Sequence, residues 1–192
     1  MKARESGMPE EERWNTFFDA GCIVDTMDCA PCGHEELVEF GCGYGTFTLP
    51  AAQRTSGLVH ALDIEQDLVA GLAAKSARIG LRNIKPVLRD FVAGGTGLPA
   101  AAVDHAMIYN LLHIENPVAL LREAHRVLKP GGTASIIHWK RDPGTPRGPS
   151  MEIRPTPEQC REWGERAGFS FIRFQDLREC CDFHYGLLLL RP

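Results

Sequence analysis

The sequence has no long hydrophobic run, and the longest one near the C-terminus is only the four leucines at 187–190. A membrane-spanning helix needs about 20 consecutive apolar residues, so no membrane span is predicted. Residues 1–12 are charged and contain no apolar stretch of the kind found in secretory signals. We therefore expect a soluble, cytoplasmic protein without a membrane partner.

A basic surplus is also missing. The formal net charge is −4, and residues 1–36 alone carry three basic and nine acidic side chains, so the remaining residues are close to neutral. A domain that binds nucleic-acid phosphates normally has a clear excess of lysine and arginine. Nucleic acid is therefore not expected as a partner, and a small molecule is.

The seven cysteines do not form a complete metal-binding pattern. Their odd number favours free thiols over a disulfide framework. Cys29 and Cys32 have the spacing of a metal or redox pair, with Cys22 nearby and His34 as a third possible ligand. Zinc needs four ligands, and no second Cys-x-x-Cys supplies them. No metal site is predicted, although a metal- or metalloid-thiol module built on Cys22, Cys29 and Cys32 is an alternative.

Strand-like and helix-like segments alternate along most of the chain. The 192 residues are enough for one domain with a substantial core, so residues 1–192 are predicted to form a single domain. Alternating strands and helices are typical of a doubly wound α/β domain, in which helices cover both faces of a mostly parallel sheet. The five expected parallel strands are 35–40, 57–64, 84–88, 103–109 and 133–139.

The last third of the chain has a different pattern. Residues 140–157 contain five of the thirteen prolines and are predicted to form a stiff, irregular loop on the substrate side. Thr156 and Gln159 then form a capping-box pattern that opens a helix ending at Gly168. Two final strands, at 169–177 and 185–190, are joined too closely for a parallel crossover. The sheet is therefore expected to have seven strands and to close with an antiparallel hairpin.

The N-terminal segment carries an aromatic pattern. Trp14, Phe17, Phe18 and Cys22 recur at intervals of three to four residues, which is typical of a short amphipathic helix. Residues 1–33 are therefore predicted to form a helical lid segment, which would cover the site together with the 140–157 loop.

A glycine-rich stretch, E-F-G-C-G-Y-G at 39–45, follows the first predicted strand. In an open α/β sheet this position lies near the switch point where ligands bind, and glycine lets a ligand approach the backbone closely. The dinucleotide pattern G-x-G-x-x-G fails because Thr46 stands where its third glycine should be, and no Gly-Lys-Ser/Thr follows. Glu39 would repel a diphosphate but suits a cationic ligand.

The complete motif set resembles that of the class I S-adenosylmethionine-dependent methyltransferases, and within them the type 11 group, which is similar to the ubiquinone/menaquinone biosynthesis methyltransferases. The resemblance covers most of the chain from about Trp14 onward. It implies methyl transfer from S-adenosylmethionine to a small-molecule acceptor by in-line displacement. An NAD(P)-dependent oxidoreductase is the main alternative. The matching motifs are E-F-G-C-G-Y-G, A-L-D-I, R-D-F, N-L-L-H and R-V-L-K-P-G-G.

The resemblance also implies which residues bind the cofactor. Asp63 would hold the ribose hydroxyls, as a carboxylate at the end of a second strand can. Asp90 would accept a hydrogen bond from the adenine amine, or it simply caps a turn. Asn110 would contact the methionine end, or it only ends its strand. The matched positions are Glu39, Gly41, Cys42, Gly43, Asp63, Ile64, Asp90, Phe91 and Asn110.

Two histidines are the candidate catalytic residues. His113 follows the fourth predicted strand and His138 closes the fifth, so both are placed at the ligand-binding edge of the sheet. Histidine can accept a proton near neutral pH, but a base is needed only if the acceptor carries a proton. Met151 and Ile153 indicate a partly apolar acceptor cavity. The sequence leaves open the identity of the acceptor, the acceptor atom and the oligomeric state.

Overall fold

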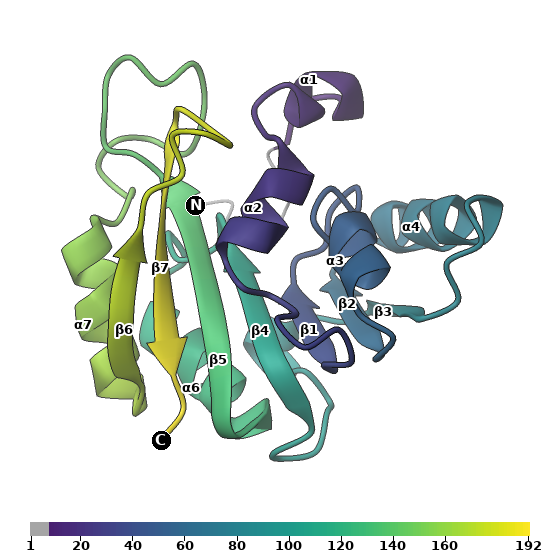
Figure 1. Cartoon of the computed structure of the whole chain (residues 1–192). Helices are drawn as coiled ribbons and strands as arrows, with labels where there is room; N and C mark the ends of the chain where they lie inside the picture. The colour runs from purple at the N-terminus through teal and green to yellow at the C-terminus, as the bar shows by residue number, and fades with distance from the viewer. Residues whose placement is uncertain (1–7) are drawn as a thin grey trace.

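The computed structural model describes residues 8–192, and within this range it contains a seven-stranded sheet in the order β3-β2-β1-β4-β5-β7-β6 (Figure 1). The strands are β1 (Leu37–Phe40), β2 (Val59–Asp63), β3 (Ile84–Leu88), β4 (Val103–Tyr109), β5 (Leu128–Trp139), β6 (Ser170–Gln175) and β7 (His184–Leu190). The helices are α1 (Glu11–Asn15), α2 (Ala20–Thr26), α3 (Thr48–Arg54), α4 (Gln66–Arg78), α5 (Phe91–Gly94), α6 (Pro117–Val127) and α7 (Pro157–Ala167). The predicted doubly wound fold is confirmed.

Strands β1 to β5 pair in parallel, and β7 runs antiparallel to both of its neighbours, β5 and β6. The predicted antiparallel hairpin is therefore present, but its second strand lies inside the sheet and its first strand forms the edge. Burial explains this order. All of β7 up to Leu189 is buried, whereas most of β6 is exposed or half-buried, so the more apolar strand takes the inner position.

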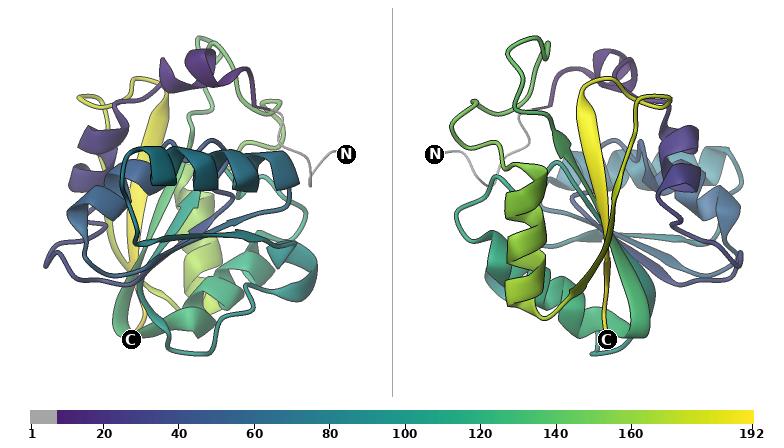
Figure 2. Two further views of the ribbon diagram at one scale, coloured as in Figure 1. Left: turned by 90° about the vertical axis from the view of Figure 1, so that its right-hand side faces the viewer. Right: turned by 60° about the vertical axis from the view of Figure 1, so that its left-hand side comes forward.

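Helices cover both faces of the sheet (Figures 1 and 2). Helices α2, α3 and α4 lie on one face, and α6 and α7 on the other. Side chains of β1 contribute to the cores on both faces of the sheet. Val38 and Phe40 belong to the core beneath α6, and Leu37 belongs to the core beneath α2 and α3. Each fully buried aliphatic or aromatic side chain stabilises the fold by about 1.5–3 kcal/mol.

The N-terminal aromatic segment forms two helices instead of the predicted one. Asp19 interrupts the pattern because its side chain accepts a hydrogen bond from the Cys22 backbone N–H at 2.9 Å and caps the start of α2. Phe17 and Phe18 consequently lie in the turn between α1 and α2. The predicted lid segment starts at residue 1, and its residues 1–7 lie outside the described residues.

Two further boundaries differ from the predictions. Residues 129–132, expected as the exit of the preceding helix, belong to β5, where the pairing register with β4 shifts between Val103 and His105. A register shift lets the strand begin earlier and still bring its later residues into line. The short helix α5 was not predicted. Asp90 creates it by accepting hydrogen bonds from the N–H groups of Val92 and Ala93.

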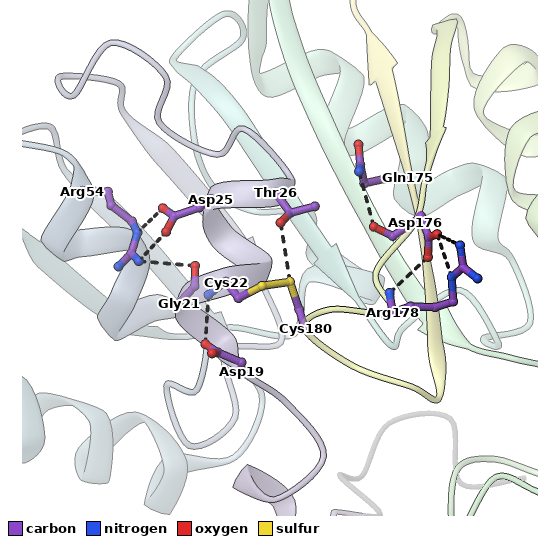
Figure 3. The surroundings of a disulfide bond; sticks show 10 residues. All are labelled: Asp19, Gly21, Cys22, Asp25, Thr26, Arg54, Gln175, Asp176, Arg178 and Cys180. Carbon is purple, nitrogen blue, oxygen red and sulfur yellow. Dashed lines mark hydrogen bonds and ion pairs between the residues drawn. A yellow bond between two sulfur atoms is a disulfide. The ribbon is translucent and has the colours of Figure 1, made fainter.

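The free-thiol prediction is wrong for one pair of cysteines. Cys22 on α2 forms a disulfide with Cys180 in the β6–β7 connection, with the two Cα atoms 5.4 Å apart (Figure 3). Nearby, Arg54 holds Asp25 of the same helix through two hydrogen bonds. Within the described residues the other five cysteines are free. The bridge joins residues 158 positions apart, so no local pattern announces it.

The metal-thiol alternative is also wrong. Cys22 is committed to the disulfide, Cys29 is buried against the Tyr109 hydroxyl, and Cys32 is exposed. Between residues 8 and 192, no group of three His, Cys, Asp or Glu side chains is placed to hold a metal ion. In the same range, no helix combines the length and apolarity needed to cross a bilayer.

Candidate active site

A cavity of about 430 Å³ opens at the carboxyl end of the parallel strands. Of the residues predicted to bind the cofactor, all but Glu39 line it. His113 lines it too, whereas His138 is fully buried and lies outside the lining. The further lining residues are Met8, Trp14, Thr46, Phe47, Arg89, Val92, Tyr109, Leu111, Ile114, Trp139, Arg147, Gly148, Pro149 and Ile153.

The glycine loop presents bare backbone to this cavity. Gly41 and Gly43 have φ values of +70° and +52°, a region that favours glycine. A Cβ atom on Gly43 would lie 2.8 Å from the terminal carbon of Met8, and one on Gly41 would lie 3.2 Å from Leu111. Side chains at these positions would therefore occupy space that an extended ligand needs.

Asp63 at the end of β2 ties the glycine loop to the next turn. Its Oδ2 accepts a hydrogen bond from the Gly43 N–H at 2.8 Å, and its Oδ1 accepts one from the Glu65 N–H at 3.0 Å. A carboxylate has about four acceptor positions, so these two bonds leave room for a pair of ligand hydroxyls. The same side chain can thus shape the loop and bind a ribose.

Glu39 lies beneath the loop, with 1% of its side chain exposed. Thr48, the first residue of α3, donates its hydroxyl to Glu39 Oε2, so the acid connects β1 to that helix. Burial raises the pKa of Glu39 to about 8. The hydrogen bond from Thr48 acts in the opposite direction and lowers this pKa, whereas the negative charge of Asp63 raises it further. The predicted role of Glu39 in orienting the loop stays a prediction.

The sequence predicted an adenine subsite beyond Asp63, and the side chains there are exposed and apolar. Ile64, which directly follows Asp63, is 37% exposed, and Val92, two residues after Asp90, is 45% exposed. Oδ1 of Asp90 is engaged in capping α5. The role of Asp90 toward adenine remains a prediction, because a cap and a ligand contact can share one carboxylate.

Asn110, directly after β4, has an unusual conformation. Its φ is +58°, and its backbone N–H donates to the Ile137 carbonyl at 2.8 Å. Both polar atoms of its side chain are buried, and neither has a hydrogen-bond partner among the described residues. A buried polar group without a partner costs about 1–3 kcal/mol, so this amide is poised for a polar ligand group. The Asn110 amide and the unsubstituted backbone of the glycine loop together suit the polar amino-acid end of S-adenosylmethionine.

One wall of the cavity is aromatic. Trp14 packs with its ring centroid 5.0 Å from Phe18 and 6.4 Å from Trp139, and Phe17 lies 5.5 Å from Trp139. The Tyr109 ring also lines the cavity, while its hydroxyl is occupied in the core by Cys29 and Ser135. Trp14, Tyr109 and Trp139 all line the cavity.

The proline-rich loop completes the wall through a residue that the sequence did not single out. Arg154 is 5% exposed and donates hydrogen bonds to the carbonyls of Pro149, Lys140 and Arg147. These bonds hold Arg147, Pro149 and Ile153 against the cavity, whereas Met151 lies outside its lining. The sequence does not show that this loop folds around Arg154, because an arginine in a polar loop is usually exposed.

Residues 37–132, half of the chain, match the family described as "Methyltransferase domain". The chain belongs to this methyltransferase family. S-adenosylmethionine is accordingly its methyl donor. The NAD(P)-dependent alternative has no support from this match.

Two curated methyltransferases are similar in sequence. The chain is 28% identical to "Aklanonic acid methyltransferase DauC" of Streptomyces sp. (strain C5), over 76% of this chain and 74% of that protein. It is 32% identical to "Nocamycin O-methyltransferase" of Saccharothrix syringae, over 59% of this chain and 40% of that protein. The chain thus spans well under half of the second relative.

The fold has close solved counterparts. The crystal structure of a SAM-dependent methyltransferase from Aquifex aeolicus superposes with a TM-score of 0.81, over 95% of this chain and 94% of that one, at 21% identity. This likeness concerns the fold. Together with the family match, it agrees with the predicted Rossmann-like methyltransferase architecture.

Proposed function

We propose that this methyltransferase methylates an oxygen atom of an apolar small molecule held against Trp14, Trp139 and Ile153. The observation that carries the proposal is the division of one cavity into two parts. One part has bare glycine backbone and the unpartnered Asn110 amide, and the other has aromatic walls and a single histidine, His113. Sequence similarity to nocamycin O-methyltransferase supports oxygen as the acceptor atom.

Asp63, the glycine loop and Asn110 form the cofactor part of the site in this proposal. Asp63 holds the ribose hydroxyls, Gly41, Cys42 and Gly43 lie under the methionine and ribose portions, and Asn110 pairs with the methionine end. The exposed side chain of Ile64 supports the adenine, and Asp90 and Phe91 lie at its edge. When bound, S-adenosylmethionine supplies a methyl group on a positively charged sulfur, which is already activated for transfer.

The protein's own contribution is mainly placement. Fixing an acceptor oxygen in line with the methyl group can lower the barrier by up to roughly 7–11 kcal/mol. The aromatic wall and the loop organised by Arg154 exclude water and hold the acceptor. The segment 1–33, in its described part, and the 140–157 loop act as the lid. His113 accepts the acceptor's proton where one is present.

The test is a screen of purified protein with S-adenosylmethionine against apolar molecules grouped by acceptor atom. Release of S-adenosylhomocysteine is measured, and products are analysed by mass spectrometry and NMR. We expect turnover with apolar hydroxyl or carboxylic-acid compounds and a methyl group on oxygen. Turnover confined to amines or thiols would overturn the proposal. Turnover of small polar acceptors in preference to apolar ones would contradict the role given to the aromatic wall.

A further inference from the structure

His113 and His138 form a connected pair that leads from the cavity to the backbone of β5. Nδ1 of His113 lies 3.2 Å from Nε2 of His138, and Nδ1 of His138 lies 3.4 Å from the Trp139 carbonyl oxygen. His113 lines the cavity, and His138 is fully buried behind it. Within residues 8–192, the His113 ring makes its hydrogen bond through Nδ1, so its Nε2 remains for a ligand in the cavity.

The direction of these hydrogen bonds follows from what each atom can do. A carbonyl oxygen only accepts, so the proton of His138 must be on Nδ1. In a neutral imidazole the other nitrogen is then an acceptor, and Nδ1 of His113 must donate to it. His113 is thereby left with a bare lone pair on Nε2.

The surroundings keep His138 neutral, as this scheme requires. Burial lowers the pKa of His138 to about 3, and repulsion from the Arg154 guanidinium, and from His113 whenever that ring is protonated, acts in the same direction, while the Trp139 carbonyl opposes them. His184 and Tyr185 are the other titratable groups packed near its ring. Burial also lowers the pKa of His113, so both rings are neutral near pH 7.

We propose that His138, through the Trp139 carbonyl, is a positioning residue that fixes His113 in the tautomer with an unprotonated Nε2 facing the acceptor. The consequence is a narrower substrate class, because an unprotonated Nε2 favours an acceptor that still carries an O–H proton near pH 7, such as a hydroxyl group, over a carboxylic acid, which is already ionised. This inference rests on the proposed function, since it requires an oxygen acceptor in this cavity.

The proton and electron balance of the step is simple. The O–H proton passes to Nε2 of His113, and the oxygen uses the released electron pair to bond the methyl carbon. The carbon–sulfur bond breaks with its electron pair on sulfur, which neutralises the sulfonium charge. The imidazolium of His113 then releases its proton to water. With the opposite tautomer, His113 would present an N–H group and could not take this proton.

The first test needs no acceptor. In long-range ¹H–¹⁵N NMR spectra, protonated and unprotonated imidazole nitrogens have well-separated ¹⁵N shifts, and a His113→Gln variant assigns the His113 signals. At pH 7.5 we expect Nδ1 of His113 to be protonated and Nε2 unprotonated. A protonated Nε2 would overturn the inference, whether or not the acceptor screen succeeds. If only the acceptor screen fails, the proposed function is contradicted, but the measured tautomer of His113 is not affected.

The second test uses variants with an oxygen acceptor from the screen. His138→Phe keeps the ring volume but cannot accept from His113, and we expect kcat to fall about 10-fold or more with KM for S-adenosylmethionine unchanged. His138→Gln, whose amide oxygen can accept from Nδ1–H, should recover most of the loss and retain the wild-type His113 spectrum. Equal losses in both variants, or no loss in either, would overturn the inference. His125→Gln, on α6 and remote from the cavity, is the matched control.

If His138→Phe does not fold, the comparison of His138→Gln with the wild-type protein still decides the matter. The Gln variant must keep Nδ1 of His113 protonated and keep kcat within a few-fold of wild type. Loss of that tautomer together with unchanged kcat would show that the tautomer has no catalytic role.

Discussion

The two parts of the cavity are constructed in opposite ways. The proposed cofactor part comes from the loops that follow β1 to β4, from the glycine loop to Asn110, and its main features are backbone shape and polar side chains at strand ends. The acceptor part brings Trp14 from α1, His113 after β4, Trp139 at the end of β5 and Ile153 from the long loop. The first depends on local geometry and the second on tertiary packing. We therefore expect mutations to affect one function without the other.

The largest effect on one part of the cavity alone should come from Asp63→Asn, which affects cofactor binding. This change removes the charge that holds the Gly43 and Glu65 N–H groups and the proposed ribose contacts. Charged hydrogen bonds contribute about 1.5–3 kcal/mol each, so we expect S-adenosylmethionine affinity to fall about 100-fold by isothermal titration calorimetry. Asp104→Asn, which alters a carboxylate bonded to Lys129 at the other end of the sheet, is the matched control. Equal losses in both variants would refute the assignment.

Cys22→Ser should act on stability. Loss of the disulfide should lower the free energy of unfolding by about 2 kcal/mol, at the lower end for a native bridge, because the Arg54–Asp25 contacts still hold α2. Urea denaturation measures this, and reductant should lower wild-type stability equally. Cys32→Ser, at an exposed free thiol, should change nothing. Reductant-insensitive wild-type stability would show that the bridge does not contribute.

Trp14→Ala should weaken acceptor binding alone. Trp14 is buried between Phe18 and Trp139, and its removal opens the aromatic wall. We expect acceptor KM to rise about 10-fold, which corresponds to roughly 1.4 kcal/mol, with S-adenosylmethionine affinity unchanged. Trp163→Ala on α7, which packs against the opposite core, should destabilise the protein without this selective effect. A parallel loss of cofactor affinity in Trp14→Ala would show that the two parts are not independent.

The last expected effect is a pH dependence of stability, with opposite signs at Glu39 and at His138. The pKa of Glu39 rises from 4.5 to about 8, so the folded protein holds a proton that the unfolded chain has lost, and stability falls as pH rises through this window. The pKa of His138 falls from 6.5 to about 3, so its contribution rises with pH between those values. Each slope is at most about 1.4 kcal/mol per pH unit.

Unfolding of the cofactor-free protein, measured between pH 5 and 9, tests these signs. Compared with the wild type, Glu39→Gln should show a smaller decrease in the free energy of unfolding as the pH rises above 5. His138→Gln should flatten the rise below pH 6.5. A Glu39→Gln curve parallel to that of the wild type would mean that Glu39 is ionised in the folded protein.

The sequence predicted much of the fold because many signals are local. Strands 84–88 and 103–109 match the structure to the residue, and each ends directly before a polar residue, Arg89 or Asn110. Asn116 and Pro117 mark the start of α6 as predicted. The break at Asp19 was missed because a side-chain cap competes with helical periodicity, and the inner position of β7 depends on tertiary burial.

The candidate site shows the same division. Asp63 and the glycines could be placed at the cavity because each follows its strand directly. The sequence could not show that His138 would be buried behind His113, because both positions read as strand-end histidines. Arg154 was missed for a related reason: its partners are carbonyls of its own loop, which any sequence offers.

The Cys22–Cys180 bridge also gives the polypeptide a nearly circular connectivity. Residues 22–180 form one covalent ring that contains β1 to β6 and the exposed 140–157 segment. A single proteolytic nick in that segment would therefore leave both fragments attached. They would separate on a gel only after reduction, and a nicked protein could retain its assembled catalytic pocket.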